Sequence, residues 1–201
     1  MLRFDAVPES VRALLARLAS HEALRDFALG GDTSLALRFG HRWSVDLDFF
    51  TTREFAIDEL FEKLGLEGAT VTGRAANSLT VDAGGVKLDL LRHAYRLLEP
   101  VERIDGVTLI SLPDLAAMKL NTIANRASKK DFFDFVELLD HFTIQRMIAC
   151  FSDKDPSTDP FTVIRSLAWF EDADQEPEPV ALTGLTWETV MARTRDAVAS
   201  L

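Results

Sequence analysis

The sequence predicts an α+β protein in which an α/β lobe, residues 1–111, precedes a helical lobe, residues 112–201. Strand-like runs separated by turn residues occur only in the N-terminal half. Beyond Ser111 the chain shows helical spacing alone, which puts the boundary near residues 105–112. A length of 201 residues with 47% hydrophobic side chains is enough to bury a core, in one domain or two small lobes.

The first lobe is expected to begin with a helix capped by Ser10, with Val11, Leu14, Leu15 and Leu18 at helical spacing. A short apolar lead at 27–29 then enters the Gly30-Gly31 turn. The remaining elements are helices over 33–39 and 55–64, strands over 43–50, 69–73, 78–81 and 86–91, and an edge strand over 107–110.

The second lobe opens on a capping box, because Ser111 is followed three residues later by Asp114. The helix that it begins is expected to end near Asn125. Further helices are predicted over 130–141, 144–151, 161–170 and 187–198, and the acidic stretch 171–179 is interpreted as a solvated connector.

Composition limits the classes of partner. The net charge of -10 and pI near 4.9 disfavour general nucleic-acid binding, so any RNA surface would need basic residues gathered on one face. The one cysteine, Cys150, excludes a disulfide within the chain and is expected to be a buried free thiol. No apolar run reaches the length of a membrane span, and the N-terminus is not signal-like, so a cytoplasmic protein without a membrane partner is expected.

Asp46 and Asp48 lie two residues apart in an apolar, strand-like run and are therefore expected on one face, with Val45, Leu47 and Phe49 pointing into the core. Two adjacent ionised carboxylates repel each other and are costly to desolvate. Divalent cations remove both problems, and a Mg²⁺ pair about 3.5–4 Å apart could be shared by such carboxylates.

A third carboxylate, Asp89, lies in the strand 86–91 on the face that Lys87 and Leu91 share. Taken alone, Asp89 is best explained by a salt bridge or by exposure at a strand edge. Beside the Asp46–Asp48 pair it completes a plausible two-metal cradle and is suited to activating an attacking hydroxyl. The alternative for all three is solvated strand-edge charge.

Lys119 and Arg126 are seven residues apart, so they share one helical face and could meet the phosphates of a nucleotide. The alternative is a solvated face of ion pairs, and for Asp134 we expect that role, beside Lys130 or a neighbour. His41 and Arg42 could orient the carboxylates or contact substrate; equally, Arg42 could pair with Asp46 or Asp48. Neither the P-loop nor the dinucleotide-binding glycine pattern is present, and the histidines have no zinc-ligand spacing.

Four segments give the chain a resemblance to the AbiEii/AbiGii family of nucleotidyltransferase toxins, in the polymerase-β-like superfamily. They are FALGGDTSLALRFGHR (27–42), SVDLDFF (44–50), VKLDLL (86–91) and LPDLAAMKLNTIANRASKKDFFDF (112–135). The resemblance implies a polymerase-β-like lobe with a mixed sheet, a nucleoside triphosphate substrate and two Mg²⁺ ions. It makes Asp46, Asp48 and Asp89 metal-binding and catalytic residues, and Gly30, Gly31, Thr33, Lys119, Arg126, Lys130 and Asp131 nucleotide-binding residues.

The same resemblance implies transfer of a nucleoside monophosphate to an acceptor hydroxyl by a toxin of a toxin–antitoxin or phage-defence pair, with transfer RNA as one acceptor and a cognate antitoxin as partner. Asp32 departs from the family's glycine pair and sets a carboxylate beside the expected triphosphate. Two alternatives follow. One is a non-catalytic nucleotide- or partner-binding module; the other is a small-molecule modifier similar to aminoglycoside nucleotidyltransferases, which needs an acidic acceptor pocket.

Overall fold

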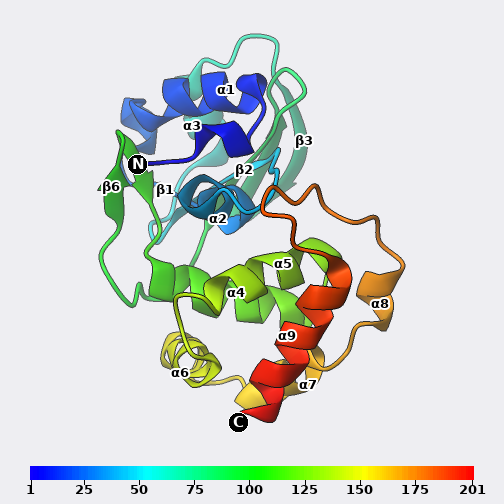
Figure 1. Cartoon of the computed structure of the whole chain (residues 1–201). Coiled ribbons are helices and arrows are strands. Elements are labelled where there is room, and N and C mark those ends of the chain that lie inside the picture. Colours follow the sequence, from blue (N-terminus) through cyan, green and yellow to red (C-terminus); the bar gives the residue numbers. More distant parts are fainter. The chain divides into compact units, whose positions relative to one another are not determined.

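The computed structural model describes all 201 residues and divides the chain into two compact units. Unit 1 comprises Met1–Arg38, Ser44–Arg96 and Pro100–Ile110, and unit 2 comprises Phe39–Trp43, Leu97–Glu99 and Ser111–Leu201. Figure 1 traces both along the chain. Two short segments of the predicted first lobe, Phe39–Trp43 and Leu97–Glu99, therefore belong with the C-terminal helices.

Unit 1 is built on a mixed seven-stranded sheet of order β3-β4-β5-β2-β1-β7-β6. β1 pairs antiparallel with β2 and parallel with β7, while β2 pairs parallel with β5. The strands are β1 (Ala28–Gly30), β2 (Leu47–Thr51), β3 (Thr70–Ala75), β4 (Ser78–Asp82), β5 (Lys87–Arg92), β6 (Glu102–Ile104) and β7 (Val107–Leu109). The mixed sheet, together with the helices, confirms the predicted α+β class.

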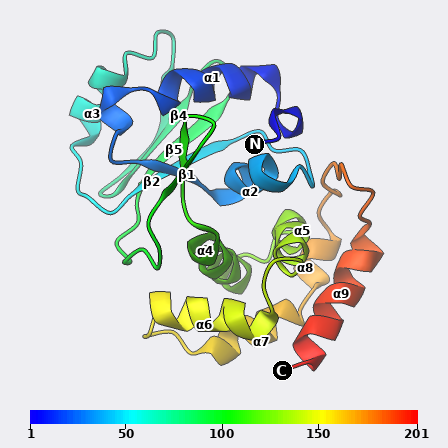
Figure 2. The ribbon, with the colours of Figure 1, turned by 60° about the vertical axis from the view of Figure 1, so that its left-hand side comes forward.

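Helices α1 (Glu9–Ala19) and α3 (Ile57–Leu64) lie over one face of this sheet, as Figure 2 shows. The core beneath them takes alternate residues of the central strands, including Leu47 and Phe49 of β2 and Leu88 and Leu90 of β5. Because successive strand residues alternate between faces, the residue between each of these two apolar pairs is directed to the other face. These two residues are Asp48 and Asp89. Helix α2 (Gly31–Phe39) follows β1 directly.

Three local predictions for unit 1 are wrong. Ser10 does not cap α1, because Pro8 is the N-cap and the helix begins at Glu9. The strand predicted from residue 43 begins at Leu47, and Val45 is 49% exposed instead of lying in the core. The residue 107–110 strand is not an edge, because β7 lies between β1 and the unpredicted β6.

Unit 2 is helical. Its helices are α4 (Leu112–Asn125), α5 (Lys129–Leu138), α6 (Ile144–Lys154), α7 (Pro160–Leu167), α8 (Glu171–Asp174) and α9 (Trp187–Ala199). The predicted capping box at α4 is confirmed, since the Ser111 hydroxyl accepts a hydrogen bond from the Asp114 N–H at 3.3 Å. An aromatic cluster of Phe132, Phe133, Phe170 and Trp187 packs α5 against α9.

The acidic stretch 171–179 is folded, which corrects its interpretation as a solvated connector. It contains α8, and Asp174 accepts a hydrogen bond from the Trp187 indole N–H at 2.6 Å. Glu176 accepts a bond from the Ser128 hydroxyl at 2.6 Å. Cys150 is a buried free thiol, as predicted, and burial raises its pKa. None of the helices has the combined length and apolar character that crossing a membrane requires.

Candidate functional site

A glycine turn places the start of α2 directly against a carboxylate. Gly31 has a φ of +60°, and a Cβ added there would lie 2.5 Å from Asp48 Oδ2. A Cβ on Gly30 would lie 2.7 Å from the Phe50 ring. Because real side chains do not tolerate such distances, β2 can lie this close to the turn only where both residues are glycine.

Asp48 and Asp89 are register partners on the parallel strands β2 and β5, and Gly30 is the partner of Asp48 on the other side. Neighbouring strands are about 4.8 Å apart, so register partners carry neighbouring side chains on one face. Asp46 lies just before β2 and is half-buried. The structure thus brings Gly31, Asp48 and Asp89 together, with Asp46 two residues away along the chain.

The electrostatics of Asp48 are those of a carboxylate without enough positive charge around it. Burial raises its pKa to about 7, with further contributions from Asp32, Asp89 and Asp46 and opposition from Lys87. The Lys87 ammonium donates to Asp89 Oδ2 at 2.7 Å. The other oxygen, Asp89 Oδ1, is buried without a hydrogen-bond partner. The i, i+2 spacing predicts Lys87 on the same face as Asp89 but indicates no role for it.

These observations fit a divalent cation. The carboxylates of Asp32, Asp89 and Asp46 raise the pKa of Asp48, and the ammonium of Lys87 lowers it. An unpartnered carboxylate oxygen is a good ligand for a hard cation such as Mg²⁺. The donors are all oxygen atoms, as Mg²⁺ prefers.

Thr33 of α2 is fully buried, and its hydroxyl holds the segment that leads into β2. This hydroxyl forms a hydrogen bond with the Ser44 hydroxyl at 2.7 Å and donates to the Asp46 carbonyl oxygen. The Ser44 N–H donates to the Ala6 carbonyl oxygen. These bonds explain why residues 44–46 do not pair with a neighbouring strand, and they fix the backbone of Asp46.

Unit 2 contains a buried network around Asp134. Arg42 donates to both Asp134 oxygens at 2.7 Å, and His41 Nε2 lies 2.7 Å from Oδ1. Arg42 thus has Asp134 as a partner, a residue distant in sequence that the sequence did not indicate. Burial acts to raise the pKa of Asp134, but Arg42, Lys119 and His41 outweigh burial and hold it well below its usual range.

Asp131 forms ion pairs with Lys119 and Arg126, the two basic residues predicted to contact phosphates. Lys119 Nζ lies 2.8 Å from Asp131 Oδ1 and 2.8 Å from Asp134 Oδ2. Arg126 Nε lies 2.9 Å from Asp131 Oδ2. Lys119 is buried, whereas the Arg126 side chain is 53% exposed. Lys130 lies half-buried in the first turn of α5.

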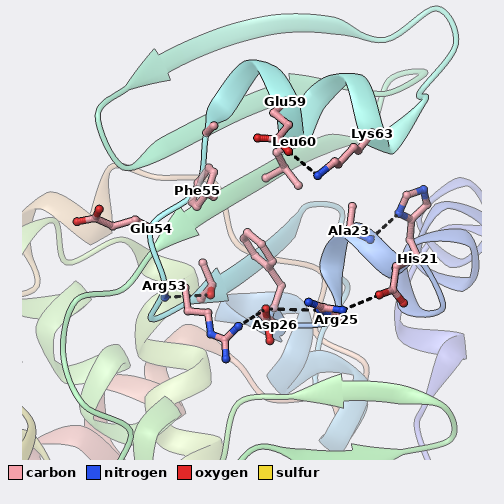
Figure 3. Close-up of a pocket in the computed structure, with 14 residues that line it drawn as sticks. His21, Ala23, Arg25, Asp26, Arg53, Glu54, Phe55, Glu59, Leu60 and Lys63 are labelled. Carbon is pink, nitrogen blue, oxygen red and sulfur yellow. Dashed lines mark hydrogen bonds and ion pairs between the residues drawn. The ribbon is translucent and has the colours of Figure 1, made fainter.

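A cavity of about 620 Å³ lies at the other end of β1 and β2, beside α3 (Figure 3). Its walls carry charges of both signs, and they pair with each other: Arg53 with Asp26 at 2.8 Å and Lys63 with Glu59 at 2.5 Å. None of the three predicted metal ligands lines it. With this balanced charge, the cavity is not the acidic pocket that a cationic small-molecule acceptor would need.

Comparisons with known proteins agree with the resemblance that the motifs carry over part of the chain. The model of the family described as "Nucleotidyl transferase AbiEii toxin, Type IV TA system" matches residues 12–88. An uncharacterized protein of Aquifex aeolicus (strain VF5) is 35% identical over 130 residues, which are 61% of this chain. The match spans 62% of that relative's length.

Two solved structures extend the likeness of the fold over most of the chain. JHP933 from Helicobacter pylori is 17% identical with a TM-score of 0.60, over 94% of this chain and 88% of its own. MenT4, a nucleotidyltransferase toxin from Mycobacterium tuberculosis, is 16% identical with a TM-score of 0.59, over 99% and 86%. The family model therefore agrees with the resemblance over residues 12–88, and the solved structures show a likeness of the fold over most of the chain.

Proposed function

We propose that this chain is a Mg²⁺-dependent nucleotidyltransferase that moves a nucleoside monophosphate from a nucleoside triphosphate to an acceptor hydroxyl and releases pyrophosphate. The observation that carries the proposal is the apposition of Asp48 and Asp89 on adjacent strands, with Asp48 against the Gly31 turn. The match to the AbiEii family supports it over residues 12–88, which include Gly31, Asp46 and Asp48.

Each carboxylate has a role in this proposal. Asp46 and Asp48 would hold the cations together with Asp89, whose Oδ1 lacks a hydrogen-bond partner. Bound cations would stabilise negative charge that develops on the reacting phosphate. Asp89 orients the acceptor hydroxyl and accepts its proton, as a carboxylate within hydrogen-bond reach can do.

The turn positions these carboxylates. Gly31 lets the start of α2 approach Asp48, and the N-terminus of a helix favours the negative charge of a phosphate through its free N–H groups. The Thr33 hydroxyl fixes the Asp46 backbone, which is a positioning role. The nucleotide contacts that the resemblance implies for Lys119, Arg126, Lys130 and Asp131 stay predictions.

The biological setting follows from the family description. We propose a cytoplasmic toxin of a toxin–antitoxin pair, with an antitoxin encoded alongside it and transfer RNA as the acceptor. The net charge of -10 makes a wide RNA-binding surface unfavourable, so recognition of a single RNA end is the form of this proposal that suits the chain.

The test incubates the protein with Mg²⁺, each α-labelled nucleoside triphosphate in turn and total transfer RNA. The double variant Asp46→Asn, Asp48→Asn should label no RNA while its circular dichroism stays native. A matched control, Asp58→Asn with Asp82→Asn, removes two carboxylates from exposed positions of the same unit and should label RNA normally. Equal labelling by both double variants would overturn the mechanism.

One observation favours a second candidate, a nucleotide-binding module without transferase activity. Asp32 follows Gly31 and is among the carboxylates that raise the pKa of Asp48, so it adds negative charge where a triphosphate would enter. Binding of a nucleoside triphosphate without pyrophosphate release would favour this module. Recovery of transfer by Asp32→Gly would identify the carboxylate as the cause.

A further inference from the structure

Lys87 brings a positive charge to the carboxylates from the solvent side. It lies two residues before Asp89 on β5, and its ammonium lies 2.7 Å from Asp89 Oδ2. The Lys87 side chain is 53% exposed, whereas that of Asp89 is 12% exposed. A lysine stem is long and flexible, so the ammonium can leave Asp89 without any movement of the strand.

The ammonium occupies one oxygen of the carboxylate that would also hold a metal ion. Asp89 Oδ2 accepts the Lys87 hydrogen bond, while Oδ1 has no hydrogen-bond partner. A divalent cation bound by both oxygens, or shared with Asp48, would lie within a few ångströms of the ammonium. At that separation two positive charges repel each other appreciably, even near a protein surface.

We propose that Lys87 is a positioning residue that serves as the resident counter-ion of the Asp48–Asp89 pair and leaves Asp89 when a divalent cation binds. The inference rests on the proposed function for the identity of the site. It has two consequences. Lys87 holds the metal-free site together, and Lys87 lowers the affinity of that site for cations.

The effect of Lys87 on the affinity for cations should be modest. Because the Lys87 side chain is half exposed, water screens the pair, and ion pairs of this kind contribute modestly. Removal of the ammonium should therefore tighten Mn²⁺ or Mg²⁺ binding about two- to tenfold. It should also lower the melting temperature in EDTA, since Asp48 and Asp89 then repel each other with less compensation.

The experiment measures Mn²⁺ affinity by calorimetry and melting temperature in EDTA for Lys87→Met, with Lys87→Gln as a second neutral variant. The matched control is Lys63→Met, because Lys63 is 61% exposed and pairs with Glu59 at the cavity of Figure 3, away from the carboxylates. Lys87→Arg keeps the charge and should bind Mn²⁺ as the unmodified protein does.

Tighter Mn²⁺ binding together with a lower metal-free melting temperature, in either neutral Lys87 variant and not in the Lys63 control, supports the inference. Mn²⁺ binding in folded neutral variants that is unchanged or weaker overturns it. If the unmodified protein binds Mn²⁺ at these carboxylates but transfers no nucleotide, the proposed function is refuted while the inference about Lys87 is still tested by Mn²⁺ binding. If the unmodified protein binds no cation, both the metal site and the competition are refuted.

Discussion

Gly31→Ala tests whether the glycine turn sets the position of Asp48. The added Cβ would lie 2.5 Å from Asp48 Oδ2, whereas comfortable contacts between carbon atoms begin near about 3.5 Å. Either the carboxylate or the start of α2 must therefore shift by roughly 1 Å. The substitution also forces alanine to adopt a φ near +60°, the left-handed region.

A matched control separates the cost of the left-handed backbone from the cost of the contact with Asp48. Gly65 has a similar φ of +53°, but a Cβ there would meet nothing within 4 Å. Gly65→Ala should lose only the backbone term, about 1–2 kcal/mol of unfolding free energy. Gly31→Ala should lose at least as much stability and, in addition, displace Asp48. A misplacement of roughly 1 Å in a reacting group can lower a rate by about 100-fold.

Three measurements decide the outcome: urea unfolding, calorimetric Mn²⁺ binding and transfer of labelled nucleotide. We expect both variants to unfold at lower urea concentration, and only Gly31→Ala to lose cation affinity and transfer. If Gly31→Ala binds Mn²⁺ and transfers nucleotide as well as Gly65→Ala does, then contact with the turn does not position Asp48 and the reasoning is refuted.

Two further predictions concern the buried Asp134 and the half-buried Asp48, whose pKa values shift in opposite directions. Asp134→Asn leaves Arg42 and Lys119 without their shared partner charge and should cost about 3–5 kcal/mol of unfolding free energy in urea titrations. A loss below about 1 kcal/mol would contradict a buried network. Asp48→Asn should raise the melting temperature of the metal-free protein. Because the folded pKa of Asp48 is about 7, against about 4 when unfolded, wild-type stability falls as pH rises between these values. The gain from Asp48→Asn should therefore grow from pH 4 to 7 in EDTA; a gain independent of pH would contradict the shift.

The sequence predicts best where local chemistry decides the structure. The alternation of Val86, Leu88 and Leu90 with polar neighbours predicts β5 and its buried face, and all three residues are buried. The capping box at Ser111 predicts the start of α4, because the bond that caps the helix forms between near neighbours. These signals need no knowledge of the rest of the chain.

Prediction fails where partners are distant or elements are short. Arg42 pairs with Asp134, and nothing local to either residue indicates the other. β6 spans three residues, too few for the period-2 alternation that identifies a strand, so the sequence predicts β7 as the edge strand. The Thr33 hydroxyl likewise bonds to the backbone of Asp46, a contact that depends on how α2 lies against the following segment.

The pKa of Asp48 shifts in the opposite direction to the pKa values of Asp114 and Asp134. Burial alone would raise the pKa of Asp114, but hydrogen bonds from Lys154, Ser111 and the backbone of residues 98 and 99 outweigh burial and lower it. Arg42, Lys119 and His41 likewise outweigh burial at Asp134 and lower the pKa of that carboxylate.

Asp48 differs, because its neighbours add negative charge where the other two buried carboxylates receive positive charge or hydrogen bonds. A stability role would favour compensation at Asp48 as well, since an uncompensated buried carboxylate destabilises the fold. Perturbed groups of this kind are concentrated at functional sites. The raised pKa of Asp48 therefore supports the proposal that this carboxylate helps to bind a cation.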